Sequence, residues 1–421
     1  MSGFDAPVTR FVPYLILVSD AAYCPINISK MRFTFVSKVM LCVMCAVVVI
    51  TVIKIISQQT NIRSLYKSYA KVKKPGMKYI LLWTSQENIP FVHMGLGQSG
   101  FIKRKCPFTN CIVTDNQSLL NSYLDFDVIA FAGPELVRID QTSLPPLRLP
   151  YQKYVFASIE SPDNYPLCPK IFDGYFNWTW TYKLDSDIRW GYIVIRDMQN
   201  NIIGPKKDMH WLNQYEMAPV NETFKKKLLT KKKAAVWFVS NCHSKSRREG
   251  FMRNLRRELQ KYNLKIDVYG KCGLLVCPRK RQDQCNRLIR RDYYFYLSFE
   301  NAFSEDYVTE KVLTPLQNNA VPIVYGGANY TRFLPDGSYL NAKELGIYEL
   351  AEKMNELIKN PDMYAEYFRW KNHYTFHKTI DSVETNEYCN MCAALNDEEL
   401  VKKKSVHTDF SDWWESYDEE C

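Results

Sequence analysis

Four short apolar runs in the second half of the chain alternate with longer amphipathic segments. The runs are rich in β-branched and aromatic residues, which predicts buried strands at 234–240, 265–269, 293–299 and 321–325. The intervening pattern predicts helices at 246–262 and 309–318, followed by one or two closing helices at 343–370. Strands and helices that alternate at this spacing predict βαβ units and a parallel, Rossmann-like sheet. We therefore expect a nucleotide-binding α/β domain in this half.

The first half carries similar apolar runs, which predict strands at 79–83, 127–131 and 153–158 between loops rich in Pro and Gly. A lysine-rich stretch at 216–233 predicts an interdomain linker or a solvated helix end. A chain of 421 residues is too long for one compact core. The predicted organisation is a cytoplasmic tail at 1–32, a membrane anchor at 33–56, a stem at 57–78, an N-terminal domain at 79–215, a linker at 216–233, a C-terminal domain at 234–370 and a C-terminal tail at 371–421.

The predicted anchor centres on an uncharged run at 39–53 that shows no polar face. The run is short for a membrane span, but Lys38 and Lys54 can extend their ammonium groups to the interfaces. A signal peptide would begin nearer the terminus and end in small residues. Charges flank both sides evenly and do not set the orientation. Cysteines and glycosylation sequons do, because both suit a lumenal C-terminal part, which predicts a single-pass type II protein.

Thirteen cysteines and a formal charge of +10 bear on the cellular compartment and on the kind of ligand. The close pairs Cys106/Cys111 and Cys389/Cys392 have no neighbouring His/Cys pattern, so local disulfides in an oxidising lumen are favoured over zinc binding or redox chemistry. The pairing itself does not follow from the sequence. The basic balance suits an anionic ligand: a nucleotide diphosphate, a nucleic acid or a membrane surface. Glycans are expected at Asn116 and Asn221, and less so at Asn177 and Asn329, which lie in segments that look packed.

Three motifs could hold phosphate or metal. Gly95–Gly100 matches GxGxxG, but no helical pattern follows it, so we expect no dinucleotide there. Asp185-Ser-Asp187 has the spacing of a metal-binding DxD pair, yet a cap or salt-bridge role is favoured. Ser244–Arg248 follows a buried strand and opens a helix, where N–H groups and the Arg247 fork could bind a diphosphate. A solvated basic helix start is an equal alternative.

The stretch 293–330 carries the most specific chemistry. A buried strand ends in Glu300-Asn301, and Thr309-Glu310-Lys311 is expected to open the following helix. Open α/β sheets bind nucleotides at such strand ends. A Glu can accept both ribose hydroxyls, a Lys can neutralise a departing phosphate, and Gly326-Gly327 allow close approach of a ligand or chain.

This stretch resembles the signature of the α1,3-fucosyltransferases, glycosyltransferase family 10. It is similar in YLSFEN, DYVTEK, VPIVYGG and NY, in that order and at family spacing. The resemblance extends to 160–165 (ESPDNY), 239–241 (VSN) and 176–182 (FNWTWTY), the last in a form like that of invertebrate and plant members, and spans roughly 79–392. It departs from the family at Lys183, where Arg is common, and at 131–133 (FAG), where the family has Phe-His.

The resemblance implies a GT-B architecture, with two Rossmann-like domains facing across a cleft. It also implies inverting transfer of fucose from GDP-fucose in α1,3 linkage to GlcNAc of N-glycans or Gal-GlcNAc chains. Glu160 would be the catalytic base on the acceptor hydroxyl. The donor would be bound by Ser240, Asn241, Arg247, Tyr296, Asn301, Tyr307, Glu310 and Lys311. Arg247 and Lys311 would hold the diphosphate, and Glu310 the ribose. No metal site is predicted and no cofactor is strictly required, although Mn or Mg stimulation is compatible with this chemistry.

The resulting hypothesis is a Golgi membrane enzyme whose partners are GDP-fucose, a glycoprotein or oligosaccharide acceptor and the membrane itself. The alternative is a catalytically silent sugar-binding or scaffold protein of the same family. A nucleic-acid-binding protein is a remote third reading, because lumenal sequons speak against it and no nucleic-acid motif is present.

Overall fold

The computed structural model describes residues 43–57, 73–85, 87, 89–167 and 170–415. The chain divides into two compact units, 1–68 and 69–421. In the first, residues 43–57 form a helix whose apolar side chains are exposed. Among the described residues no helix has the length and apolarity needed to cross a membrane. The predicted tail, the first ten residues of the predicted anchor and most of the predicted stem lie outside the described ranges.

The second unit begins with a six-stranded parallel sheet in the order β2-β1-β3-β4-β5-β6. Its strands are β1 (Lys78–Leu82), β2 (Cys111–Thr114), β3 (Val128–Ala132), β4 (Lys153–Ser158), β5 (Trp178–Thr181) and β6 (Ile188–Arg189). The predicted strands at 79–83, 127–131 and 153–158 are confirmed within one residue at each end. The central strands are buried on both faces, which explains why they are continuous apolar runs rather than alternating ones.

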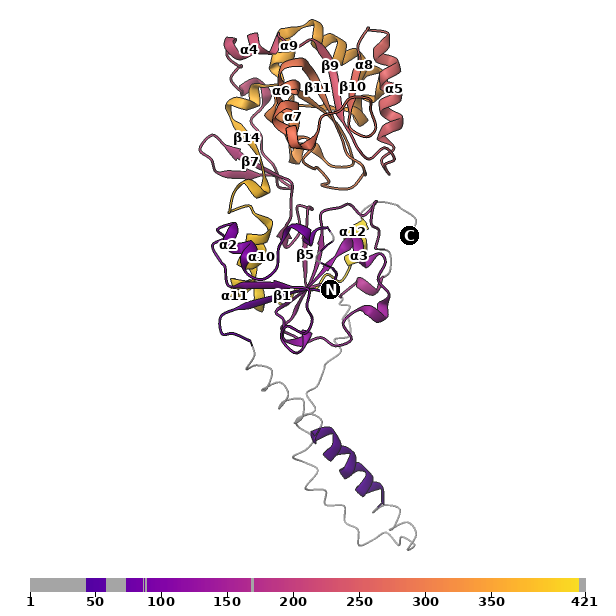
Figure 1. Cartoon of the computed structure of the whole chain (residues 1–421), viewed down its shortest axis with the longest axis vertical. Coiled ribbons are helices and arrows are strands. Elements are labelled where there is room, and N and C mark those ends of the chain that lie inside the picture. The colour runs from indigo at the N-terminus through magenta and orange to yellow at the C-terminus, as the bar shows by residue number, and fades with distance from the viewer. Residues whose placement is uncertain (1–42, 58–72, 86, 88, 168–169, 416–421) are drawn as a thin grey trace, which may run out of the picture. The chain divides into compact units, whose positions relative to one another are not determined.

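A second parallel sheet has the order β10-β9-β11-β12-β13. Its strands are β9 (Lys233–Phe238), β10 (Ile266–Tyr269), β11 (Tyr293–Phe299), β12 (Val321–Tyr325) and β13 (Leu340–Asn341). Helices α5 (Arg248–Gln260) and α8 (Ala342–Lys359) cover one face, and α6 (Gln282–Asp292) covers the other (Figure 1). The predicted α/β class with parallel sheets is therefore confirmed.

Helix α6 was not predicted, because its sequence is almost entirely polar. Only Cys285 and Ile289 of its eleven residues are buried. Its apolar residues, Cys285, Leu288 and Ile289, stand at helical spacing, but they span little more than one turn and so make too short a pattern to predict a helix. The predicted linker likewise contains a short helix, α4 (Glu222–Leu228), with Lys225–Lys227 in its last turn.

The described part of the predicted C-terminal tail, residues 371–415, folds into a strand and helices. It forms the third, antiparallel sheet β14-β7-β8 with β7 (Ile193–Asp197) and β8 (Ile202–Gly204). It then packs helices on the first sheet, where Tyr388 and Leu395 join its core on one face and Phe410 and Trp414 on the other. Strand β14 is Tyr374–Lys378, and further helices are α2 (Ser99–Lys103), α3 (Gly133–Leu136), α7 (Leu313–Gln317), α9 (Pro361–Glu366), α10 (Glu387–Asn396), α11 (Glu398–Lys402) and α12 (Phe410–Glu415).

The predicted disulfides form, but they are not local. Cys106 pairs with Cys389 and Cys111 with Cys392, across 283 and 281 residues. Residues three apart on α10 lie on one helical face, so both sulfurs point at the sheet rather than at each other. Two further bridges, Cys242–Cys272 and Cys277–Cys285, close short loops of the second sheet.

The sequons differ in accessibility. Asn116 and Asn221 are exposed, whereas the Asn177 amide nitrogen donates to the Ser405 carbonyl at 2.8 Å. Asn329 is exposed too, so the expectation that it is packed was wrong. Its side chain only caps a turn by accepting from Thr331.

The paired bridges on α10 predict a non-additive effect on stability. Cys106→Ser/Cys389→Ser leaves Cys111–Cys392 to close nearly the same loop, so each double variant alone should lose little free energy of unfolding. The quadruple variant should lose about 2–5 kcal/mol, because only then is the unfolded chain released from this constraint. Chemical denaturation of the wild type, the two double variants and the quadruple variant tests this. Cys242→Ser/Cys272→Ser, which opens a different loop, serves as the control. Additive losses would contradict it.

Candidate active site

The carboxylate of Glu300 organises the carboxyl end of β11. Its side chain is 1% exposed. One oxygen accepts the N–H and hydroxyl of Thr309, each at 2.9 Å, and the other accepts the Lys311 ammonium at 2.7 Å. A buried carboxylate is stable only when such partners replace water. The segment 309–311 is thereby fixed against the end of the strand.

Thr309-Glu310-Lys311 does not open a helix, which corrects the prediction. These residues form a turn, and α7 begins only at Leu313. The Thr309 N–H is used by Glu300, so the turn takes its geometry from the strand end rather than from the helix. The Lys311 side chain remains 25% exposed. Burial alone would lower the pKa of Lys311, but the carboxylates of Glu300 and Glu310 outweigh it and raise the pKa.

Glu160 lies beside this segment although it comes from the other sheet. It follows β4, and its Oε2 accepts the Tyr307 hydroxyl at 3.1 Å. The same hydroxyl is 3.3 Å from the amide oxygen of Asn301. Burial raises the pKa of Glu160, while the Tyr307 hydrogen bond and the Lys311 charge act in the opposite direction. A carboxylate with a raised pKa next to a cation is the arrangement of a general base.

Asp163 holds the two segments together. Its carboxylate accepts the Phe303 N–H at 2.6 Å and the Ser304 hydroxyl at 3.0 Å. The 303–304 backbone also passes so close to Gly327 that a Cβ there would lie 2.7 Å from it. The expectation of close approach at the glycine pair is confirmed at this position, and the approaching group is the chain itself.

The predicted phosphate loop is docked on the same strand end. Ser246 donates its hydroxyl to the Glu300 carbonyl at 2.7 Å. The buried Arg248 guanidinium donates to the Phe299 carbonyl at 2.6 Å and the Asn241 carbonyl at 3.2 Å. Arg247 between them has φ = +52° and an exposed side chain. No hydrogen bond or ion pair of its guanidinium occurs among the described residues, so this cation can face a ligand.

The remaining predicted donor residues differ in how far their side chains are exposed. Ser240 and Asn241 are exposed in the loop after β9, and Glu310 is exposed beside Lys311. Tyr296 is 6% exposed and stacks on Phe238 at 5.9 Å, so its ring packs in the core. Hydrogen bonds and charge interactions thus connect Glu160, Asn301, Tyr307, Glu310 and Lys311, whereas no contact between them and Ser240 is recorded in the described ranges.

The DSD carboxylates form a salt bridge and local hydrogen bonds, as expected, and the GxGxxG segment packs on the first sheet. Asp187 accepts the N–H and hydroxyl of Thr179 and lies 2.7 Å from a His407 ring nitrogen. Asp185 forms an ion pair with Lys207. Gly97 pairs with Val113 of β2 through two backbone hydrogen bonds, so the glycine loop folds back on the sheet. In the described part of the chain no group of three or more His, Cys, Asp or Glu side chains is arranged to hold a metal ion.

Three residues that shape the site were absent from the predicted set. Glu300 and Asp163 lie inside the two recognised motifs, but a sequence does not show which of several neighbouring acids becomes buried. Arg248 adjoins the predicted Arg247. A usable signal existed only for Glu300, because a charged residue that directly ends an apolar strand must find partners nearby.

The chain matches two family models over most of its second unit. Residues 75–193 match the model "Fucosyltransferase, N-terminal". Residues 228–413 match the model "Glycosyltransferase family 10 (fucosyltransferase) C-term".

Similar curated proteins come from the same family. An α-(1,3)-fucosyltransferase C of Drosophila melanogaster is 32% identical over 366 residues, 85% of this chain and 81% of the relative. A 3-galactosyl-N-acetylglucosaminide 4-α-L-fucosyltransferase of Bos taurus is 32% identical over 300 residues, 69% of this chain and 71% of the relative. A crystal structure of an α1,3-fucosyltransferase with GDP-fucose aligns with a TM-score of 0.46 and 14% identity, covering 81% of this chain and 97% of the other. The family models and the insect relative together show that the chain is a fucosyltransferase of glycosyltransferase family 10.

Proposed function

We propose that this fucosyltransferase transfers L-fucose from GDP-fucose, with inversion and in α1,3 linkage, to GlcNAc of N-glycans or of Gal-GlcNAc chains. The observation that carries the proposal is the Tyr307–Glu160 hydrogen bond, which places a partly buried carboxylate from the first sheet against the loop that holds Lys311. The two sheets then correspond to the acceptor-binding and donor-binding domains of a GT-B enzyme. The insect relative is named for α1,3 transfer and the bovine one for 4-linked transfer, so the linkage is part of the proposal.

Glu160 is the proposed base. The acceptor hydroxyl attacks the fucose anomeric carbon as the bond from that carbon to the GDP oxygen breaks, and the hydroxyl proton passes to the carboxylate. The Tyr307 hydrogen bond occupies Oε2. In the described part of the chain Oε1 has no hydrogen-bond partner, so it can accept the acceptor hydroxyl. Tyr307 orients the carboxylate and keeps it ionised before transfer.

Two cations, Lys311 and Arg247, would stabilise the negative charge of the leaving GDP. Lys311 is pre-oriented by Glu300 and Thr309, so it loses little conformational freedom when a phosphate binds. Arg247 presents an unpaired guanidinium from the start of α5, whose amino end also favours anions. Glu310 is exposed next to Lys311, where it can accept from the ribose hydroxyls.

The cellular setting is also a proposal. We propose that residues 33–56 anchor the chain as a single-pass type II protein of the Golgi membrane, with the fucosyltransferase unit in the lumen. The disulfides among the described residues and the exposed Asn116 and Asn221 support an oxidising, glycosylating compartment. Metal-independent transfer, with Arg247 and Lys311 in place of a divalent ion, remains a prediction.

Replacement of the proposed base should separate catalysis from donor binding. Glu160→Gln keeps the size of the side chain but cannot take a proton, so kcat should fall by about 10²–10⁴-fold. The Kd for GDP should stay unchanged, because the amide adds no contact to the diphosphate. Transfer assays on GlcNAc-terminated acceptors and calorimetric GDP titrations measure both. Full activity of the variant, or a wild-type protein that binds GDP but fucosylates no acceptor, would refute the assignment.

The pH profile should report the environment of Glu160. Burial raises its pKa, and the base must be ionised, so kcat/KM should fall as pH drops through a value above that of an ordinary glutamate. The Tyr307 hydrogen bond favours the ionised form. Tyr307→Phe should therefore move the acid limb of the profile to still higher pH. An acid limb that stays in place or moves to lower pH in the variant would be inconsistent with Glu160 as the base.

Loss of the fixed ammonium should affect the donor side. Lys311→Met should reduce kcat/KM for GDP-fucose by about 10²-fold or more, since a pre-oriented cation on the leaving group is removed. Lys261→Met is the matched control, because that lysine is exposed and its contacts, an ion pair with Glu258 and the ring of Tyr348, involve no residue assigned to the site. Equal activity of the two variants would exclude Lys311 from the donor site.

A further inference from the structure

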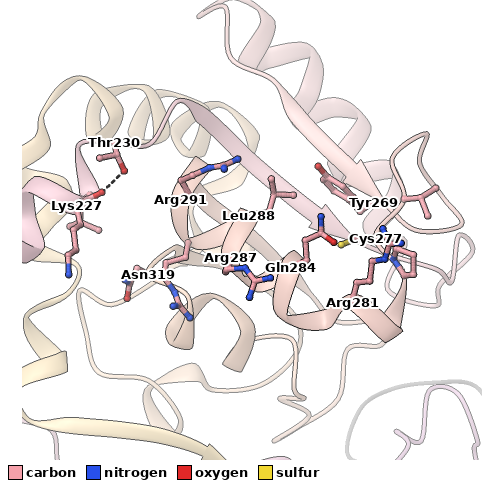
Figure 2. Close-up of a pocket in the computed structure, with 14 residues that line it drawn as sticks. Lys227, Thr230, Tyr269, Cys277, Arg281, Gln284, Arg287, Leu288, Arg291 and Asn319 are labelled. Carbon is pink, nitrogen blue, oxygen red and sulfur yellow. Dashed lines mark hydrogen bonds between the residues drawn. The ribbon is translucent and has the colours of Figure 1, made fainter.

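A second basic cavity lies beside α6, on the face of the second sheet that this helix covers. Its volume is about 650 Å³, which is within the range of small-ligand sites. Five cationic side chains line it and no carboxylate does: Lys227, Arg281, Arg287, Arg290 and Arg291. In Figure 2, Lys227 and Asn319 lie towards one end, Tyr269 and Arg281 towards the other, and Arg287 between them.

The cavity is separate from the candidate active site. None of the residues assigned to the donor or to the base lines it. At one end of the cavity, Lys227, Arg290 and Asn319 precede β9, β11 and β12, at the amino edge of the parallel sheet. At the other end Tyr269 is the last residue of β10, so the cavity extends along the face of the sheet. The donor residues lie at the carboxyl edge, where parallel strands present their ligand sites. The Cys277–Cys285 bridge ties the loop before α6 to the helix and so fixes one wall.

The positive charge of this region is only partly compensated within the protein. Arg291 pairs with Asp292, and Arg290 donates to the Asn318 amide oxygen at 3.0 Å. Lys227, Arg281 and Arg287 have no ion pair among the residues that the structure describes. Burial, with a further contribution from Arg290, lowers the pKa of the adjacent Lys231 to about 7. Like charges gathered on a concave wall repel each other, and an anion bound there would relieve that repulsion.

We propose that this cavity binds an acidic oligosaccharide, one that carries two or more sulfate, phosphate or carboxylate groups. The cations would hold the anionic groups. Gln284, Asn319 and Thr230 offer the amide and hydroxyl groups that sugar hydroxyls bind, and Tyr269 and Leu288 offer apolar surface. The site gives the protein a saccharide contact that is independent of donor binding and transfer.

The test measures oligosaccharide binding to the full-length protein. Lys227→Ser/Arg287→Ser should weaken binding of a sulfated tetrasaccharide by about tenfold or more, because two of the unpaired cations are removed. Arg253→Ser/Arg257→Ser is the matched control: it removes the same charge from the exposed side of α5, the helix that covers the opposite face of the sheet. Calorimetry measures both affinities, and thermal melts establish that each variant is folded.

Comparison ligands separate specific oligosaccharide binding from general charge attraction. The desulfated tetrasaccharide should bind at least about tenfold more weakly than the sulfated one. Equal weakening in the two double variants would mean general charge attraction, and binding of only inorganic sulfate or only phosphatidylserine vesicles would likewise overturn the proposal. The Kd for GDP should be unchanged in Lys227→Ser/Arg287→Ser. A loss of GDP affinity there would assign the cavity to the donor site, whereas failure of transfer alone would leave the oligosaccharide result standing.

Discussion

A carboxylate that is 1% exposed has exchanged its water for protein partners, and at Glu300 these partners are Thr309 and Lys311. Removing one partner from such a buried pair typically costs about 3–5 kcal/mol, so the turn cannot drift from the strand. The carbonyl of the same residue accepts Ser246, which brings the phosphate loop to the same point. One strand end therefore sets the position of both cations proposed to face the diphosphate.

The base depends on a second constraint, because it must reach this strand end from another sheet. Asp163 and Tyr307 supply the local contacts. The long-range constraint is the return of the chain to the first sheet after β14. Two disulfides fix α10 there, and the buried Lys183 ammonium donates to the carbonyls of Trp413 and Trp414 in α12. The residue that departs from the family pattern at 183 thus anchors the last described helix.

The sequence predicted the parallel sheets well, for a physical reason, whereas the roles of the predicted site residues stay predictions. Strands buried on both faces are continuous apolar runs, so β11 and β12 could be placed without error. The sequence was less informative where the local pattern of apolar residues does not show which side chains become buried. Helix α6 buries two side chains, the 309–311 turn is shaped by a carboxylate, and the pairing of Cys389 with Cys106 depends on which surface α10 covers. Such features are decided by partners far away in the chain.

The neighbouring residues Arg247 and Arg248 differ in role: one is exposed to solvent and the other holds two strands together. Arg248 is buried and uses its guanidinium to tie the ends of β9 and β11 together. That contact, with the Ser246 hydrogen bonds on the other side, leaves Arg247 in a left-handed backbone conformation that a side chain seldom adopts. Such a conformation costs on the order of 1–3 kcal/mol and persists only where surrounding contacts enforce it. The consequence is an exposed guanidinium without a hydrogen bond or ion pair among the described residues, so the strain is accounted for most directly by an anionic ligand at this strand end.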